Sequence, residues 1–382
     1  MIRLLKDITI AGLLLTAGSC QKKIDIPEWE PAISARYTTS PVKKIFGFEG
    51  ERKYAYCPSI IIDGADRHLW FCGNDPDGEF HDQIYYIHES PSGVSQPSIV
   101  LAPGNTGEWD DRHVCDPSVI EGDFNMNGVN YKYALFFLGN KNNRYYNEVG
   151  VAFSNSLTTN DWVKYPGPLV PKTWEGDQDL QYEGSNGQLY TAWGVGQPSV
   201  VSLDQKGKVL ITYTVGDQEG TRTLIREADL SDMNQPVLGT PVKMATSGLT
   251  QMNYTTSDIA PNADFAVDAN TENVYMVRHV QPAPSNYPNY IPAAVEVNMM
   301  NYNEFLTGGG VWKRIVRIDE SVSGYPRNHN AALARNAFGI TTGLENMEVY
   351  FTISKAQPDV SATPDHHAEW TYTIFKTSIQ PK

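Results

Sequence analysis

The sequence has little positive charge and few cysteines, and both shortages restrict what the chain can do. Its 382 residues include 30 Lys and Arg against 44 Asp and Glu, so the net charge is −14. Phosphate binding needs clustered basic side chains, and we therefore expect no nucleic-acid partner. The four cysteines and eight histidines include no CxxC or HxxxH pair, the spacing typical of zinc sites, and no cofactor is expected.

Long apolar runs and long helical patterns are also missing. Beyond Ser40 almost every apolar run is short, rich in Val, Ile, Tyr and Phe, and bounded by Gly, Asn, Asp or Pro. No segment shows the helical periodicity of an α/β fold, whereas short runs between turn residues are typical of strands. With 41% hydrophobic residues the chain is rich enough to bury a core. The composition therefore predicts an all-β protein.

The N-terminus has the pattern of a signal peptide. Arg3 and Lys6 precede an apolar stretch at 8–17, and small residues then lead to Cys20. This stretch is shorter than the roughly 20 apolar residues that a membrane-spanning helix needs. We therefore expect residues 1–19 to be removed on export.

The residues before Cys20 add a prediction about attachment. Ala17-Gly18-Ser19-Cys20 resembles the lipobox of bacterial lipoproteins, with Ala where Leu is usual. The resemblance implies a chain lipidated at Cys20 and held on the bacterial outer membrane or cell surface, with the membrane contacted through this anchor alone. A periplasmic or secreted protein is the alternative. Residues 20–45 contain several prolines and are predicted to be a tether.

Three cysteines remain in the predicted mature domain. They are Cys57, Cys72 and Cys115, and their spacing matches no zinc pattern. In an exported protein one pair can close a disulfide and leave one thiol over. The alternative is that all three are small buried hydrophobic side chains.

Paired strands recur along the chain. Residues 59–62 turn at Asp63-Gly64 into 68–72, and residues 199–201 turn at Lys206-Gly207 into 209–213. Third strands are predicted at 83–87, 148–153 and 221–225. Two weaker strand pairs follow the same plan, 264–268 with 273–277 and 329–333 with 347–352. Such repetition indicates radially arranged small sheets.

This repetition predicts one five-bladed β-propeller over residues 46–382, built of four-stranded antiparallel blades. A large β-sandwich or jelly roll is the alternative, but it does not require the same hairpin five times. The loops at 171–193 and 281–292 are expected to be insertions between blades. In a propeller the first strand of each blade lines the central channel, so the heads of five strands should meet there. The expected heads are Cys57, Asp116, Gln197, Asp264 and His329.

With this architecture the chain resembles the five-bladed propeller glycoside hydrolases, the arabinanase and xylosidase group of family 43 and its invertase-like relatives. The motifs that carry the resemblance are short. They are the Asp-Pro step in 112–119, the strand 150–157 followed by Asp161-Trp162, and Asn328-His329-Asn330.

The resemblance implies three carboxylates at the heads of the first three blades, for the acid, base and positioning roles of glycoside hydrolysis. When these roles are placed on this sequence, the base position falls on Cys57, the positioning residue on Asp116 and the acid on Gln197. Only Asp116 is the carboxylate that the family has at its position. A catalytic chain would then need displaced carboxylates, of which Glu183 and Glu148 are the favoured candidates. Further candidates are Asp82, Asp179 and Asp258.

Other side chains are expected to contact substrate. Arg112 and His113 flank Asp116, and aromatic rings in nearby loops stack well on sugar rings. The predicted aromatic contacts are Trp109, Trp174 and Tyr182. His329 is expected to bind substrate as a neutral ring, and a structural cation beside it in the channel is an open alternative.

Two functions of different class follow. The chain is a glycoside hydrolase acting on a pentose- or furanose-containing polysaccharide or oligosaccharide, or it is a catalytically degenerate surface lipoprotein that binds a glycan without cleaving it. Whether the chain is an enzyme stays open because Cys57 and Gln197 replace two expected carboxylates. A scaffold that binds another protein on the propeller face is a third alternative.

Overall fold

The computed structural model describes residues 36–74, 78, 80–158, 160–184, 187–253, 259–358, 360–363 and 366–382. The predicted signal peptide, Cys20, most of the predicted tether and Asp258 lie outside these residues. Within them the regular structure is almost all strand, and no helix has both the length and the apolar composition needed to cross a membrane. The all-β prediction is confirmed.

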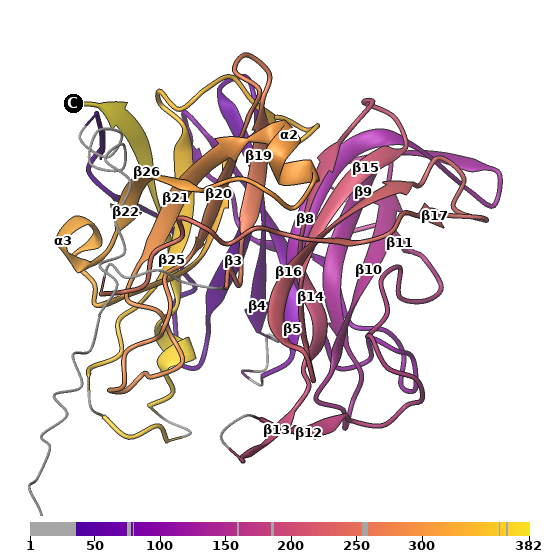
Figure 1. Ribbon diagram of the computed structural model, residues 1–382, viewed down its shortest axis with the longest axis horizontal. Helices are drawn as coiled ribbons and strands as arrows, with labels where there is room; N and C mark the ends of the chain where they lie inside the picture. Colours follow the sequence, from indigo (N-terminus) through magenta and orange to yellow (C-terminus); the bar gives the residue numbers. More distant parts are fainter. Residues whose placement is uncertain are drawn as a thin grey trace, which may run out of the picture.

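The strands form five blades around one centre (Figure 1), and one parallel pairing, Asn147 with Gly194, joins blades II and III into a continuous sheet. Blade I contains β3 (Ala55–Asp63), β4 (Asp66–Asn74), β5 (Asp82–Ser90), β6 (Gly93–Val94) and β7 (Ser98–Leu101). Blade II contains β8 (His113–Met126), β9 (Val129–Asn140), β10 (Asn147–Ser154) and β11 (Val163–Lys164). Blade III contains β14 (Gly194–Ser202), β15 (Lys208–Asp217), β16 (Gly220–Asp229), β17 (Val237–Leu238) and β18 (Val242–Lys243).

The remaining strands complete the ring. Blade IV contains β19 (Asp264–Asp268), β20 (Asn273–His279), β21 (Val295–Asn301) and β22 (Lys313–Ile318), with β24 (Ile340–Thr341) added in parallel. Blade V contains β23 (Arg327–Leu333), β25 (Glu348–Ser354), β26 (Thr373–Pro381), β1 (Tyr37–Thr39) and β2 (Lys43–Phe46). Three short helices, α2 (Tyr302–Leu306), α3 (Glu320–Ser323) and the 3-10 helix Ala368–Thr371, lie in connections.

Both ends of the described chain lie in blade V. β1 and β2 pair antiparallel with β26, so the N-terminal strands and the C-terminal strand share one sheet. This pairing ties the first and last parts of the ring together, as the indigo and yellow strands in Figure 1 show. The propeller therefore begins by Tyr37, within the stretch 20–45 that the sequence predicts to be a tether.

Apolar layers between neighbouring blades hold the ring together. Within each blade the strands alternate side chains between two faces, and each face packs against the next blade. Trp70 and Phe137 belong to the buried layer between blades I and II, and Phe265 and Trp312 to the layer between blades III and IV. Corresponding layers join blades II to III, IV to V and V to I.

The two predicted insertions lie at different places in the fold. Residues 171–193 connect blades II and III, as expected, and contain a hairpin of β12 (Gln181–Glu183) and β13 (Leu189–Thr191). Residues 281–292 instead connect β20 to β21 inside blade IV. The expectation that they separate two blades is wrong, because the third strand of blade IV, Val295–Asn301, begins only after this loop.

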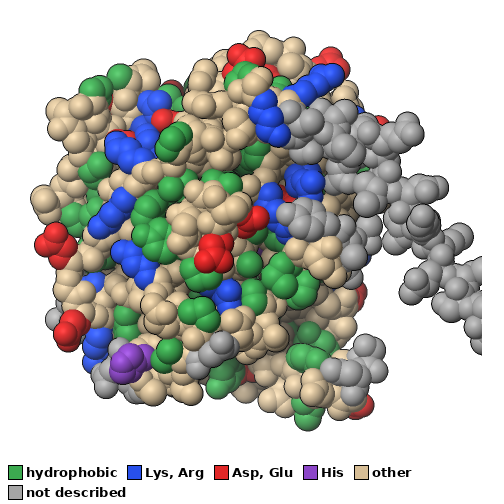
Figure 2. Space-filling view, turned by 90° about the vertical axis from the view of Figure 1, so that its left-hand side faces the viewer, with side chains coloured by type: hydrophobic (Ala, Val, Ile, Leu, Met, Phe, Trp, Pro, Cys, Tyr) green, Lys and Arg blue, Asp and Glu red, His purple; other side chains and the backbone are tan. Residues whose placement is uncertain are grey.

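The outer surface carries charges of both signs. On the face in Figure 2, basic and acidic side chains are interspersed with apolar ones. This side of the molecule does not present a field of a single sign to a partner.

Candidate functional site

A β-bulge interrupts the first strand of four blades at the centre of the ring. The pairing register shifts between Tyr56 and Ser59, between Cys115 and Ser118, between Gly196 and Ser199, and between His329 and Ala332. A residue within a bulge makes no backbone hydrogen bond to the neighbouring strand, so Pro, which lacks an N–H, is tolerated there. The bulge also turns the side chain before the Pro away from the sheet. This explains the Pro-Ser repeat: the Pro lies in the bulge, and the Ser resumes the pairing.

The first residue inside each of these four bulges has a left-handed backbone, and so does Asn262, which lies just before the first strand of blade IV. The φ angles of Cys57, Asp116, Gln197, Asn262 and Asn330 lie between 42° and 55°, and these five residues line one central cavity. We call them the site ring. The first three are the predicted heads of blades I to III.

The predicted heads of blades IV and V are wrong by one or two residues, because Asn262 and Asn330 occupy the positions assigned to Asp264 and His329. Blades IV and V have Ala263 and Ala331 where the other blades have Pro, so the Pro-Ser signal is missing there. Asn is among the residues that adopt positive φ most readily, and an Asn-Ala step was the available signal.

Asp264 lies two residues beyond Asn262, at the floor of the cavity, and its carboxylate serves the fold. It accepts hydrogen bonds from Ser199 Oγ (2.6 Å) and the Leu333 N–H (2.9 Å), and it lies 3.3 Å from the guanidinium of Arg335. Arg335 is buried and also donates to Ser118 Oγ at 3.0 Å. In each blade one residue lies two positions after the site-ring residue. We call these five residues, together with Arg335, the plug: Ser59, Ser118, Ser199, Asp264 and Ala332.

His329 lies beside the site ring and is held neutral. Burial lowers its pKa to about 4, and its ring packs against Tyr372 with centroids 4.4 Å apart. Its Nδ1 is 2.5 Å from Asn330 Oδ1, and the nearby His279 accepts a hydrogen bond from the Asn330 N–H. These described contacts are with neutral groups, and the buried His329 Nε2 has no hydrogen-bond partner among the described residues.

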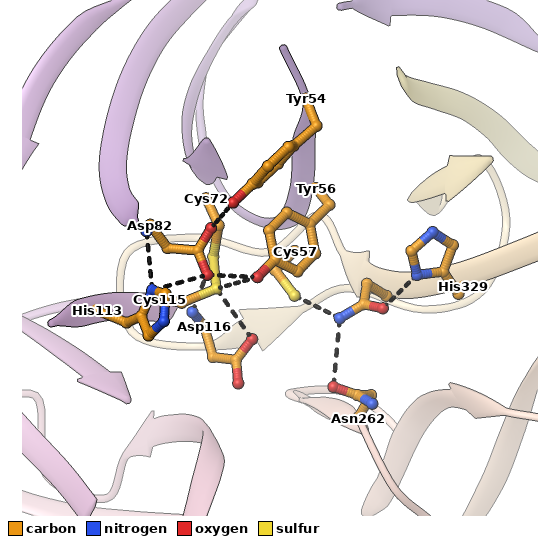
Figure 3. Close-up of a disulfide and its surroundings, with 11 residues drawn as sticks. Tyr54, Tyr56, Cys57, Cys72, Asp82, His113, Cys115, Asp116, Asn262 and His329 are labelled. Atoms are coloured by element: carbon orange, nitrogen blue, oxygen red, sulfur yellow. Dashed lines mark hydrogen bonds and ion pairs between the residues drawn. A yellow bond between two sulfur atoms is a disulfide. The ribbon is translucent and has the colours of Figure 1, made fainter. Parts of the chain in front are cut away.

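Asp82 is a buried carboxylate next to the site ring, at the start of β5. Tyr54 and Tyr56 donate hydrogen bonds to its two oxygens at 2.5 and 2.9 Å (Figure 3). Burial raises the pKa of Asp82 to about 6, the nearby charge of Asp116 adds to the shift, and the tyrosine hydroxyls oppose it. The sequence identifies Asp82 as able to reach the channel but cannot show the tyrosine contacts that hold it there.

Asp116 is the carboxylate of the site ring. Burial raises its pKa, while hydrogen bonds from the Cys57 thiol and the Gln197 N–H lower it. Its own N–H lies 3.0 Å from Cys72 Sγ, so the backbone as well as the side chain is fixed.

A disulfide lies directly beside this carboxylate. Cys72 in β4 and Cys115 in β8 are joined, so the bond crosses from blade I to blade II, and Cys57 stays free and buried. The observed state is therefore the disulfide with one thiol left over. Burial, together with the charge of Asp116, raises the pKa of the Cys57 thiol.

The cavity above the site ring has a volume of about 320 Å³ and is lined mostly by neutral polar groups. Its described lining consists of Tyr56, Asp82, His113, Cys115, Asp116, Leu138, Asn147, Gln197, Asn262 and Asn330. No Lys or Arg is among these described residues. Burial, with a contribution from Arg112, lowers the pKa of His113 to about 3, so this ring is neutral as well.

The two displaced carboxylates that the sequence favours, Glu183 and Glu148, lie outside the central cavity. Glu183 is exposed on the β12–β13 hairpin, which projects beyond the blades at the bottom of Figure 1. Glu148 is buried at the start of β10, where it accepts a hydrogen bond from the Lys172 N–H at 3.1 Å. Neither lines the described cavity that holds Asp82 and Asp116.

Of the residues expected to contact substrate, His113 lines the cavity and the aromatic ones do not. Trp109 packs inside blade II, stacked on Phe137, in space left by Gly139 and Gly150. The other two rings have partners of their own in the connection between blades II and III. Trp174 donates to the Gln178 carbonyl, and Tyr182 stacks on Tyr190.

Arg112 does not line the cavity either. Its backbone N–H donates to the Asn140 carbonyl at 3.0 Å, and its charge reaches the site through its effect on the pKa of His113. Its influence on the cavity is therefore electrostatic.

No protein-family model and no curated protein matches the sequence. Solved structures do match. The family 117 glycoside hydrolase Zg3597 from Zobellia galactanivorans is similar over 91% of each chain, with a TM-score of 0.55 and 11% identity. The α-L-arabinofuranosidase PaAbf62A from Podospora anserina, solved with cellotriose, matches 91% of this chain and 98% of its own, with a TM-score of 0.53 and 9% identity.

An α-L-arabinofuranosidase from Lactobacillus brevis is similar over 86% of this chain and 90% of its own, with a TM-score of 0.51 and 10% identity. Identities this low show a common fold. The resemblance to propeller glycoside hydrolases is confirmed at that level, and the chain has the all-β propeller fold of these enzymes.

Proposed function

We propose that the chain hydrolyses a glycosidic bond in a neutral, pentose- or furanose-containing glycan, with Asp82 and Asp116 as the catalytic pair. The observation that carries this proposal is that both carboxylates line one cavity and that both have raised pKa values. Two carboxyl groups facing the same bond are what glycoside hydrolysis requires.

The environments of the two residues support different roles. Asp82, with a pKa of about 6, holds a proton in weakly acidic solution and is the general acid. Asp116, the other carboxylate that lines the cavity, is then the general base. In the reaction, water attacks the anomeric carbon and gives a proton to Asp116. The glycosidic C–O bond breaks, and the leaving oxygen takes the proton of Asp82.

The lining of the cavity supports a neutral sugar. Amides, tyrosine hydroxyls and a neutral His113 donate to and accept from sugar hydroxyl groups, whereas a uronate would call for Lys or Arg. The similar structures point the same way, since two of them are α-L-arabinofuranosidases by name.

Release of reducing sugar from arabinans, xylans, fructans and galactans tests the proposal. We expect turnover on at least one glycan, lost in Asp82→Asn and in Asp116→Asn. The matched control is Asp63→Asn, an exposed carboxylate at the opposite end of the strand that carries Cys57. No turnover by the folded chain on any of these glycans would contradict hydrolysis.

A second candidate function is glycan binding without cleavage. It is favoured by the site ring, in which four of five positions carry Cys, Gln or Asn, none of which is a carboxylate. Calorimetric titration with the same glycans separates the two functions. Saturable binding without turnover supports the binding protein, and binding with turnover supports the hydrolase.

The expected location of the chain is proposed along with its function. Export and lipidation at Cys20 would place the propeller on the cell surface, where polysaccharides are met. Labelling with a fatty-acid probe in a bacterial host, compared with Cys20→Ser, tests the anchor. An unlabelled chain would contradict it.

A further inference from the structure

Three sulfur atoms and one carboxylate meet at the inner ends of blades I and II. One ligand atom from each of Cys57, Cys72, Cys115 and Asp116 lies within 4.8 Å of the other three. Four thiolate or carboxylate ligands around Zn²⁺, with Zn–S bonds of about 2.3 Å, are separated from one another by about 3.8 Å in a tetrahedron. Because the Cys72 and Cys115 sulfurs are bonded to each other, they have to move apart to reach this spacing once the disulfide is open.

The groups around the sulfurs suit thiolate ligands. The Asp116 N–H lies 3.0 Å from Cys72 Sγ, and Asn330 Nδ2 donates to Cys57 Sγ. Polar hydrogens placed around ligand atoms orient them and offset their charge. Two of the three sulfurs therefore have a polar hydrogen beside them, whereas the Tyr56 hydroxyl, 3.2 Å from Cys115 Sγ, donates its hydrogen to Asp82.

The backbone at this site is held independently of the disulfide. Tyr56 pairs with Cys72 across β3 and β4, and Cys115 pairs with Leu138 across β8 and β9. The buried layer between blades I and II also holds the two blades against each other. Opening the disulfide therefore frees two sulfurs without removing the contacts that position them.

We infer that the reduced chain binds one thiophilic divalent cation, such as Zn²⁺ or Cd²⁺, through Cys57, Cys72, Cys115 and Asp116, and that the Cys72–Cys115 bond closes this site. A dithiol reductant supplies two electrons and two protons to open the bond and itself becomes a disulfide. Binding of the ion then displaces the protons of the three thiols. Soft sulfur ligands favour Zn²⁺ and Cd²⁺ over Ca²⁺ or Mg²⁺.

The experiment uses the whole chain with Cd²⁺ as the probe. The protein is reduced with dithiothreitol, freed of reductant under argon, and dialysed against Cd²⁺. We expect one ion per chain by elemental analysis, with ultraviolet thiolate-to-cadmium absorption, and no stoichiometric binding by the oxidised chain. Failure of the reduced, folded chain to bind the ion overturns the inference, and so does loss of the fold on reduction.

Variants identify the ligands. Cys57→Ser and Asp116→Asn should each weaken binding at least about tenfold, and Asp63→Asn should bind as the unsubstituted chain does. The double variant Cys72→Ser/Cys115→Ser should keep the near-ultraviolet circular dichroism of the folded propeller and bind no ion. Binding that survives Cys57→Ser unchanged would overturn the assignment. Because no glycan is present, the outcome is independent of the hydrolase proposal.

Discussion

The site ring and the plug are two levels at the inner ends of the five blades, separated by two residues along the chain, and they differ in backbone conformation and, for most members, in burial. The site ring has left-handed φ angles and borders an open cavity. In the plug, Ser118 and Ser199 are almost fully buried and hydrogen-bond with Arg335. The bulge between the two levels lets one strand serve both purposes, because it turns the first side chain towards the cavity and returns the second to the sheet.

This difference teaches where the molecule stores strain and where it gains stability. A non-glycine residue with a left-handed backbone costs on the order of 1 kcal/mol, and the site ring has five such residues. The plug has an ion pair between the buried Arg335 and the half-buried Asp264, with its hydrogen bonds made, and removing one partner leaves the other unsatisfied. Substitutions in the site ring should therefore change chemistry, and substitutions in the plug should change folding.

The largest effect should come from Asp116→Asn. If Asp116 is the general base, kcat/KM on the active glycan should fall by about 10² to 10⁴, with little change in thermal stability. Glycan hydrolysis and thermal unfolding, measured on the same samples, check this. A variant that lost stability rather than turnover would place Asp116 with the plug.

Arg335→Met should have the next largest effect, and on stability. It leaves the half-buried Asp264 without its partner and removes the hydrogen bonds of the buried Arg335, and we expect the free energy of unfolding to drop by about 1 to 3 kcal/mol in denaturant titrations. The double variant Arg335→Met/Asp264→Asn should recover part of this loss, since the unpaired charge is removed. A loss below about 1 kcal/mol for Arg335→Met would contradict the role of the plug.

Asp82 should make stability depend on pH. Its folded pKa of about 6 is above the usual carboxyl value near 3.8, so the folded state binds the proton more tightly than the unfolded state does. Asp82 therefore adds roughly 2 to 3 kcal/mol to the free energy of unfolding below about pH 4, and this stabilisation is lost as the pH rises through 6. The difference in unfolding free energy between the unsubstituted chain and Asp82→Asn, measured from pH 4 to 8, isolates this slope. A difference that stays constant with pH would contradict the raised pKa.

The smallest effect should be seen at Asn262. Asn262→Ala should be less stable than Asn262→Gly by about 1 kcal/mol, because Ala bears the cost of the positive φ and Gly does not. At position 266, in the regular part of β19, the order of stability should be reversed, so Ala266→Gly should be less stable than the unsubstituted chain. Equal stability of the two Asn262 variants would show that the left-handed backbone there is not strained.

Much of the architecture could be predicted from local patterns. The hairpins at Asp63-Gly64 and Lys206-Gly207 were found, because strand periodicity and turn residues are local signals. The Pro-Ser steps located three members of the site ring for the same reason. Asn262 and Asn330 were missed because Ala replaces Pro after them and the local signal disappears.

Of the two carboxylates proposed as the catalytic pair, only one could be singled out from the sequence. Asp116 was marked by its Pro-Ser step, whereas Asp82 is one of several carboxylates at strand ends. Its distinguishing contacts are with Tyr54 and Tyr56, 28 and 26 residues away in sequence. The aromatic loop around Glu183 favours it in the sequence, but that loop forms a separate hairpin with its own stacked tyrosines.

The sequence by itself determined the strands, their turns, the fivefold repetition and the residue types at three strand heads. These features depend on local signals, namely the two-residue period of strands and the backbone preferences of Gly, Pro and Asp. The tertiary structure alone decided that Asp82 joins Asp116, that Asp264 joins Arg335, and that Cys72 pairs with Cys115 while Cys57 stays free. Each of these pairings unites strands from different blades or from different positions in one blade. Packing of the closed ring sets their distances, and no local pattern records them.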